Sequence, residues 1–177
     1  MQGRSYPADC PVAREDLRYL RVLHRNAEGQ ALVGEMIVGR RIAADVLDIL
    51  RELFESGYPI ERMRLVDLYD GNDEASMREN NSSCFNFRYI SHTTTVSKHG
   101  RGEAVDINPL YNPYHKVLPD GTEVIEPATG APYLDRSGDF PYKIEKGDLC
   151  CRLFRRHGFT WGGDWTSRKD YQHFEKP

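Results

Sequence analysis

The sequence lacks any long apolar stretch. Its 177 residues contain no run of 18 or more consecutive apolar residues, which is about the length that a transmembrane helix requires. The N-terminal segment MQGRSYPADCPVARED also lacks the apolar core of a signal peptide. We therefore expect no membrane span, and the sequence leaves open whether the protein is cytoplasmic or a mature or trimmed form.

Basic charge is also scarce. The formal net charge is -3 and the sequence pI is about 6.1, so the chain lacks the basic excess that is typical of nucleic-acid-binding proteins. Hydrophobic residues make up 39% and charged residues 29%, as in soluble globular proteins. The length indicates one domain over residues 1–177, in which residues 1–14 form an extended N-terminal arm. We do not expect nucleic acid as a partner.

Cysteines are few, and their spacing matches no zinc-finger pattern. Cys150 and Cys151 lie in an apolar helical pattern, which indicates buried thiols. Cys10 and Cys84 could pair as a disulfide in an oxidising compartment or stay free, because connectivity cannot be read from a sequence.

Periodicity predicts strands and helices that do not alternate regularly. Two β-rich runs with a turn between them predict a hairpin, and residues 41–56 place apolar side chains on one helical face before Gly57. Asp148 opens a second, short helix. The remaining expected segments are the hairpin strands 17–23 and 31–38, short strands at 63–68 and 85–90, and a long loop at 109–142. This order favours an α+β fold over a doubly wound sheet.

Two segments carry residues that suit a metal. The first, SKHGRGEAVDINP at 97–109, holds His99 and Asp106, and the second, DYQHFE at 170–175, holds His173. Catalytic zinc sites take three such protein ligands and leave a fourth position for water. His99 and Asp106 are seven positions apart, which on an unbroken strand would point them to opposite faces. Gly100 and Gly102 permit a sharp turn that lets the two side chains converge.

Asp170 precedes His173 by three residues, so a tight bend places both on one side. Its carboxylate is then positioned to accept a proton from water without binding the metal, as a general base does. The other histidines are interpreted as surface or core residues: His24, His92, His115 and His157.

These motifs resemble those of the VanY-like zinc peptidases, the D-alanyl-D-alanine carboxypeptidase and L-alanyl-D-glutamate endopeptidase family. The family motif S-x-H-x-x-G-x-A-x-D occurs here as Ser97, His99, Gly102, Ala104 and Asp106. The second motif, (D/E)-x-x-H, occurs as residues 170–173 after the run WGGDW, and NNSSCFNFR at 80–88 is similar to a further family stretch. The resemblance extends over roughly residues 30–176.

The resemblance implies a small central antiparallel sheet with flanking helices, as in the hedgehog N-terminal domain, and one zinc ion per chain. It also implies that His99, Asp106 and His173 are ligands and Asp170 is the base. Arg88 would stabilise the developing oxyanion, with Arg78 as its competitor. We expect Ser97, Trp161 and Trp165 to contact the substrate.

By the same resemblance, the substrates are peptidoglycan stem peptides, the location is the bacterial cell envelope or outside the cell, and the protein is a monomer. A carboxypeptidase needs a cation for the terminal carboxylate, which Lys98, Arg101 or Arg168 could supply, whereas an endopeptidase needs an open groove. The sequence leaves both types open.

Two other functions compete with a peptidase. A non-catalytic zinc-containing cell-wall binding module would not need to keep Asp170, so the presence of this residue favours the enzyme. A metal phosphoesterase commonly uses two metals about 3.5–4 Å apart, and the sequence offers ligands for one.

Overall fold

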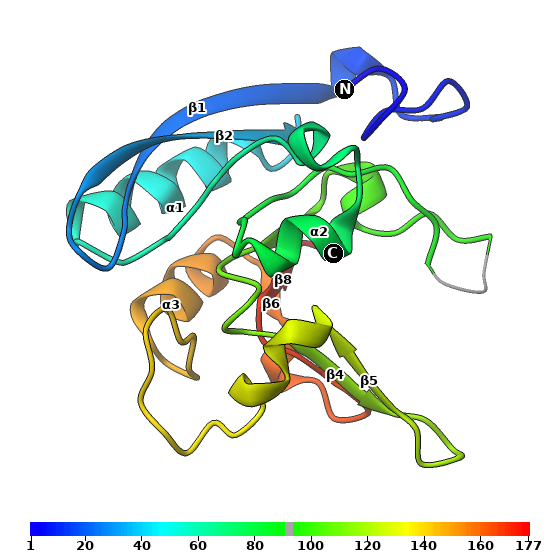
Figure 1. Ribbon diagram of the computed structural model, residues 1–177. Helices are drawn as coiled ribbons and strands as arrows, with labels where there is room; N and C mark the ends of the chain where they lie inside the picture. The colour runs from blue at the N-terminus through cyan, green and yellow to red at the C-terminus, as the bar shows by residue number, and fades with distance from the viewer. Residues whose placement is uncertain (91–93) are drawn as a thin grey trace.

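The computed structural model describes residues 1–90 and 94–177 and has a mixed α+β fold with antiparallel sheets, as predicted. Helices and strands follow one another along the chain without regular alternation (Figure 1). They are β1 (Leu17–Arg25), β2 (Ala31–Gly39), α1 (Ala43–Glu55), α2 (Asp73–Arg78), β3 (Ala104–Asp106), β4 (Tyr114–Val117), β5 (Glu123–Glu126), α3 (Leu149–Arg156), β6 (Thr160–Trp161), β7 (Lys169–Asp170) and β8 (His173–Glu175). Short 3-10 turns connect several of them.

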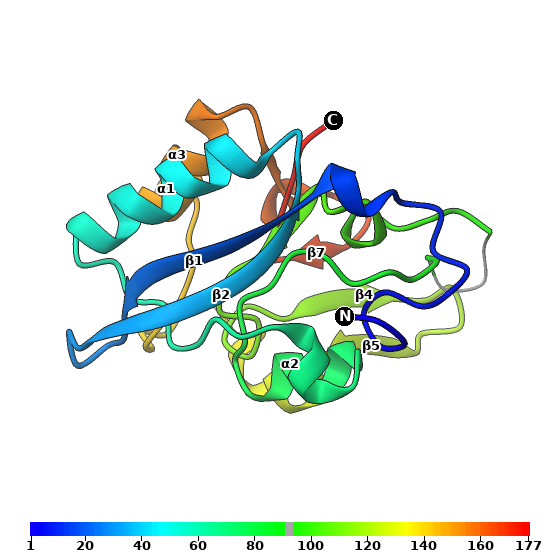
Figure 2. The same ribbon diagram turned by 90° about the horizontal axis from the view of Figure 1, so that it is seen from above.

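The predicted hairpin and first helix are confirmed. β1 and β2 pair in register from Leu17 opposite Gly39 to Arg25 opposite Ala31. α1 packs along one face of this hairpin, with α3 beside it (Figures 1 and 2). Its apolar stripe is fully buried, and Gly57, at a φ of 73°, adopts the left-handed conformation that ends many helices.

A second antiparallel sheet lies in the middle of the molecule, in the strand order β3-β8-β6. Phe174 of β8 stacks on Phe154 of α3, with ring centroids 4.1 Å apart and planes inclined by 13°. Both rings are fully buried, so β8 is fixed against the core on the side of Phe174. Its neighbours His173 and Glu175 therefore point to the opposite face of the strand.

The prediction of strands at 63–68 and 85–90 is wrong. Val66–Tyr69 form a 3-10 turn, and residues 85–90 run extended without joining a sheet. The Asn81 side chain donates to the Arg64 carbonyl and accepts from the Arg64 amide, two bonds that a neighbouring strand would otherwise make. A side chain thus replaces a strand partner here, which periodicity cannot predict.

The long loop predicted at 109–142 is also wrong, because this segment contains β4, β5 and a 3-10 turn at Ala128–Tyr133. The β4–β5 hairpin extends through β7 into a third sheet, in the order β5-β4-β7. The fully buried Asn112 fixes the base of the segment. Its amide donates to the carbonyls of Asn108 and Tyr142 and accepts from the Ile144 amide and from Arg136.

All four cysteines are free thiols. Cys150 and Cys151 are buried in α3, which confirms the interpretation of this pair. Cys84 is buried beside the β2 strand, and Cys10 is partly exposed in the N-terminal arm, so the structure contains no disulfide between them. The arm itself packs on the body through Ser5, whose hydroxyl donates to Asp67.

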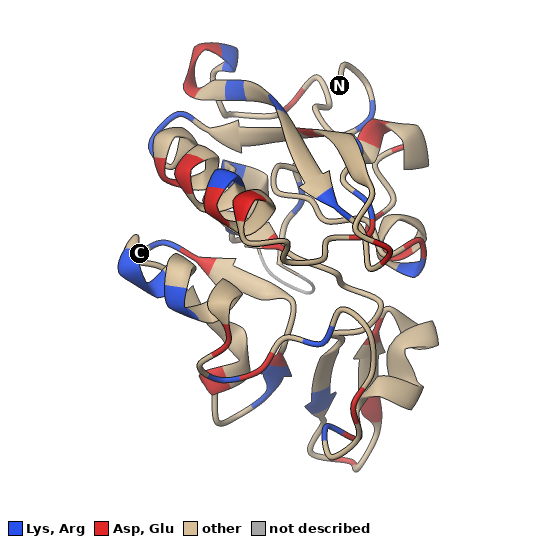
Figure 3. Ribbon diagram, turned by 90° about the vertical axis from the view of Figure 1, so that its left-hand side faces the viewer, with Lys and Arg blue, Asp and Glu red and all other residues tan. Residues whose placement is uncertain are grey.

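Charges of both signs are spread over the elements visible in Figure 3. α1 carries mainly acidic residues on its surface and the neighbouring α3 carries arginines, and the two helices are joined by the ion pair between Glu52 and Arg156. Among the described residues, no helix is long and apolar enough to cross a membrane.

We predict that Gly102→Ala destabilises the fold by about 2 kcal/mol or more, because φ is 67° there and an added Cβ would lie 2.5 Å from the Gly39 amide nitrogen. Gly121→Ala is the matched control: φ is 85°, but a Cβ would meet no atom within 4 Å, so only the conformational cost of about 1 kcal/mol applies. Urea unfolding of both variants measures the difference. Equal losses would show that the contact between Gly102 and β2 is not tight.

Candidate metal centre

Three side chains from distant parts of the sequence meet beside the central sheet. His99 lies in a 3-10 turn, Asp106 ends β3, and His173 begins β8 directly opposite Asp106 in the strand register. One ligand atom from each residue lies within 4.8 Å of those of the other two, and all three residues are buried. As predicted, Gly102 takes up a left-handed conformation that ends the His99 turn before β3 starts. This cluster could hold one metal ion.

The ring orientation of His99 is fixed by the backbone. Its Nδ1 lies 2.7 Å from the carbonyl oxygen of Cys84, so Nδ1 donates its hydrogen there. Nε2 therefore faces the cluster, 3.2 Å from Asp106 Oδ2 and 3.1 Å from His173 Nδ1. A histidine that donates one ring hydrogen to a backbone carbonyl presents the lone pair of the other nitrogen to a metal. Nε2 is thus the atom of His99 that would contact a metal ion held by this cluster.

His173 is oriented by Glu175, a residue that the sequence analysis did not single out. Its Nε2 lies 3.2 Å from Glu175 Oε2, while Nδ1 lies 3.0 Å from Asp106 Oδ1 and faces the cluster. Residues 173 and 175 share a face of β8, so this pairing follows from strand alternation. The acidic residue two positions after the motif histidine is the signal that could have identified it. By holding Nε2, Glu175 leaves Nδ1 as the atom of His173 that would contact a metal ion.

The cluster is strongly polarised. Burial alone would raise the pKa of Asp106, but the charge of His99 and the hydrogen bonds from both histidines hold it well below its usual range. Burial alone would lower the pKa of His173, but the hydrogen bonds to Asp106 and Glu175 raise it to about 10. Asp106 is thus ionised, and a positive charge is favoured at the point where the three side chains meet.

Asp170 lies at the edge of this cluster, at the end of a short strand. It ends β7, opposite Tyr114, and a bend then brings the chain into β8. Its Oδ2 is 4.0 Å from His173 Nδ1, and its Oδ1 is buried without a hydrogen-bond partner. Burial raises the pKa of Asp170 to about 7, with further upward contributions from Asp106 and Glu126. An unpartnered carboxylate oxygen in a buried site is suited to exchange protons with a bound molecule.

The two arginines that competed in the sequence analysis lie in different places. Arg88 forms an ion pair with Asp73, and its positive charge lowers the pKa of Asp170 and of Glu126, so it lies near the cluster. Arg78 lies in α2, where it pairs with Glu74 one helical turn earlier. Of these two arginines, Arg88 is the one whose charge acts on the pKa of Asp170.

The residues expected to contact a substrate occupy three kinds of position. The hydroxyl oxygen of the buried Ser97 accepts from the Gly100 amide, so Ser97 holds the His99 turn. The Trp165 ring lies against His173, with centroids 5.4 Å apart. Trp161 is 4% exposed, and its indole nitrogen donates to the Tyr171 carbonyl. Of the three, Trp165 lies in direct ring contact with the cluster.

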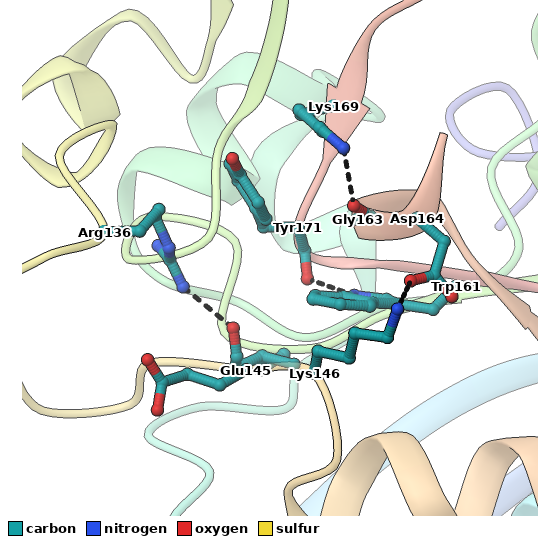
Figure 4. A pocket seen from close by; sticks show the side chains of 9 residues that line it. Arg136, Glu145, Lys146, Trp161, Gly163, Asp164, Lys169 and Tyr171 are labelled. Atoms are coloured by element: carbon teal, nitrogen blue, oxygen red, sulfur yellow. Dashed lines mark hydrogen bonds and ion pairs between the residues drawn. The ribbon is translucent and has the colours of Figure 1, made fainter. Parts of the chain in front are cut away.

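Trp161 lines a different hollow, which Figure 4 shows with Lys169 and Tyr171 beside it. The volume of this pocket is about 370 Å³. Lys169 and Tyr171 flank Asp170 in the sequence, so alternation directs them into this pocket and Asp170 to the metal cluster. Asp164, which belongs to the run WGGDW, also borders this pocket and forms an ion pair with Arg155.

The cations considered for a substrate carboxylate differ in their contacts. Lys98 is bound to Glu103 and to the Lys176 carbonyl. Arg101 is exposed in the His99 turn. Arg168 lies over the Trp165 ring, with its guanidinium carbon 4.3 Å from the centroid.

Three other described histidines are not part of the cluster. His24 bonds to the Ile60 carbonyl, His115 pairs with Glu123, and His157 pairs with Asp45. His92 lies outside the described residues.

Comparison with known families gives one match. A family model described as D-alanyl-D-alanine carboxypeptidase matches residues 91–176, a span that contains all three residues of the cluster and Asp170. Comparisons with curated proteins and with solved structures gave no match. The match supports the resemblance that the motifs indicate: over residues 91–176 the chain is similar to the D-alanyl-D-alanine carboxypeptidase family of peptidases.

Proposed function

We propose that this protein is a zinc-dependent peptidase that hydrolyses peptide bonds in peptidoglycan stem peptides. The observation that carries the proposal is the convergence of His99, Asp106 and His173 next to an unpartnered carboxylate oxygen of Asp170. Three ligands from histidine and aspartate match the protein ligand set of catalytic zinc sites, which leave one coordination position open.

The donor set fits zinc in chemistry as well as in number. Two imidazole nitrogens and one carboxylate oxygen are borderline and hard ligands of the kind that zinc accepts. Each histidine is held in the required tautomer by a second partner, the Cys84 carbonyl for His99 and Glu175 for His173. Zinc held by these residues supplies Lewis acidity, which polarises a carbonyl group and makes a water molecule more acidic.

Asp170 takes the part of general base. Its free Oδ1 accepts a proton as water attacks the peptide carbonyl, and the same carboxyl group then donates this proton to the leaving amine. Arg88 lies near Asp170, and 44% of its side chain is exposed. Its guanidinium supplies hydrogen-bond donors to the carbonyl oxygen of the substrate, on which negative charge develops. The planar guanidinium suits this task because its donors have a fixed geometry.

The proposed substrate indicates where in the cell the protein acts. Peptidoglycan stem peptides are found in the bacterial cell envelope, so we propose that the protein acts there or outside the cell, as a monomer. Digestion of purified wall fragments, followed by mass analysis of the products, tests the substrate and identifies the bond that is cleaved. Unchanged fragments after digestion with zinc-loaded protein would contradict the proposal.

The alternative is a zinc-containing cell-wall binding module without catalysis. Such a module would gain nothing from a buried carboxylate with a free oxygen beside its metal, because an unsatisfied buried polar atom costs stability. Asp170 therefore favours the enzyme over the module.

We predict close to one zinc ion per chain in the wild-type protein and a large loss of zinc in His173→Ala, since the variant lacks one of three ligands. His157→Ala removes a histidine that pairs with Asp45, away from the cluster, and serves as the control. Elemental analysis after dialysis measures both. Equal zinc in wild type and His173→Ala would remove His173 from the site.

We predict that Asp170→Asn keeps its zinc and its fold but loses about 10²–10⁴-fold in turnover, the usual contribution of general acid–base catalysis. Asp164→Asn is the matched control, because the Asp164 carboxylate forms an ion pair with Arg155 and borders the Trp161 pocket instead of the candidate metal centre. Turnover of a muropeptide is the measurement. If Asp164→Asn loses activity while Asp170→Asn keeps it, the roles are reversed.

We predict that Arg88→Ala lowers kcat by about 10²–10³-fold with a small change in KM, because the oxyanion exists only in the transition state. Arg88→Lys should recover part of the loss, and Arg78→Ala should have little effect, since its partner is Glu74 in α2. Steady-state kinetics on one peptide compares the three variants. A loss in Arg78→Ala alone would exchange the two assignments.

A further inference from the structure

Arg168 contacts the ring of Trp165, which in turn contacts the ring of His173 in the candidate metal centre. The Trp165 ring lies against the His173 ring, with centroids 5.4 Å apart, and the guanidinium carbon of Arg168 lies 4.3 Å from the Trp165 centroid. The charge of Arg168 also affects Glu175, which holds His173, and Tyr114, which lies opposite Asp170. Arg168 therefore lies beside the same centre as the proposed catalytic groups.

The guanidinium of Arg168 has no acidic partner. Within residues 1–90 and 94–177, no ion pair or hydrogen bond engages it, although it is exposed and its neighbours carry charge. A guanidinium that lies over an aromatic ring keeps its N–H groups free at its edge. The contact with Trp165 thus restricts where the cation lies while leaving its hydrogen-bond donors available for a ligand.

Three other cations near the two motifs are already engaged, whereas Arg101 is exposed in the His99 turn and is the competitor of Arg168. Lys98 donates to Glu103 and to the Lys176 carbonyl, and Lys169 donates to the Gly163 carbonyl. Arg88 is paired with Asp73. Arg168 differs from these three because, within residues 1–90 and 94–177, no hydrogen bond or ion pair engages its guanidinium.

We propose that Arg168 binds a carboxylate of the substrate that lies one or two residues from the scissile bond. This inference rests on the proposed peptidase function. Consecutive Cα atoms of a bound peptide are about 3.8 Å apart. A carboxylate one or two residues from the scissile bond can therefore reach the Arg168 guanidinium, which is separated from His173 by the Trp165 ring. Arg168 is a specificity residue in this proposal, and Trp165 is the residue that positions it.

Two carboxylates of a stem peptide have the required chemistry. One is the free C-terminal carboxylate, which a carboxypeptidase must recognise. The other is the carboxylate that a D-glutamate keeps when it is linked through its side chain, which is close to the bond cleaved by an L-alanyl-D-glutamate endopeptidase. Identifying the carboxylate that Arg168 binds would therefore also identify the type of peptidase.

The test uses the zinc-loaded protein and three synthetic stem pentapeptides: one with both carboxylates free, one amidated only at the C-terminus, and one amidated only at D-glutamate. In the wild type, amidation of the recognised carboxylate should lower kcat/KM about 10- to 100-fold, because a charge-assisted hydrogen bond is lost. Arg168→Gln should show that loss already on the free peptide and no further loss on amidation. Arg168→Lys should be intermediate.

Controls separate recognition from a general effect on the site. Arg51→Gln removes an exposed arginine of α1 and should behave as the wild type, and Arg101→Gln tests the competing cation of the His99 turn. If Arg168 only supports Trp165, its substitution lowers the activity on all three peptides equally and the wild-type response to amidation persists. That result, or a loss of the amidation response in Arg101→Gln instead, overturns the proposal.

A binding measurement keeps the inference testable without turnover. Calorimetric titration of the same three peptides into zinc-loaded wild type and Arg168→Gln should show the same dependence on one carboxylate. If wild type binds with this dependence but cleaves no peptide, the peptidase function fails and the carboxylate site stands. If wild type cleaves the peptides but amidation changes neither affinity nor kcat/KM, the carboxylate site fails and the peptidase function stands.

Discussion

The pairing of Asp106 with His173 across β3 and β8 is the interaction on which the rest of the site depends. These two residues lie directly opposite each other in an antiparallel register, and the carboxylate and the imidazole are 3.0 Å apart. A shift of β8 by one residue would turn His173 to the opposite face of the sheet, away from Asp106. The buried stack of Phe174 on Phe154 opposes such a shift, because it fixes the other face of β8 in the core.

The cluster requires support because it is buried and charged. Burial of an unpaired charge is costly, so each member needs partners that the fold provides. His99 is held by the Cys84 carbonyl, His173 by Glu175, and Asp106 by both histidines. The three residues are thus aligned before any metal binds, which reduces the ordering that metal binding must accomplish.

The short segment from β7 to β8 separates two environments. Asp170 faces the metal cluster and Tyr114, while Lys169 and Tyr171 line the pocket with Trp161 (Figure 4). The bend between the strands then returns His173 to the side of Asp170. A motif of four residues can therefore provide both a ligand and a proposed base, because a strand, a bend and a second strand place its first and last side chains together.

Much of this site could be predicted from the sequence, because the ligands occur in short motifs whose spacing is set by local geometry. The glycines after His99 indicated the turn, and the position of Asp170 three residues before His173 indicated a shared side. The hairpin, α1 and the helix after Asp148 followed from periodicity, since their apolar faces are buried in a regular way. By itself, the sequence determined the α+β class, and it singled out the residues that are proposed as the metal ligands and the base.

Tertiary structure decided what depends on contacts between distant segments. Pairing of Tyr114 with Asp170 places part of residues 109–142 in a sheet. At 63–68 no strand forms, because the Asn81 side chain bonds the backbone of Arg64 where a neighbouring strand would pair. Tertiary structure also selected Nε2 of His99 and Nδ1 of His173 through the Cys84 carbonyl and Glu175, and it placed Arg168 over Trp165. Except for the Glu175 pairing and the contact of Arg168 with Trp165, these contacts join segments whose separation in space is set by packing of the whole chain. Periodicity and motif spacing describe only a residue's near neighbours in sequence.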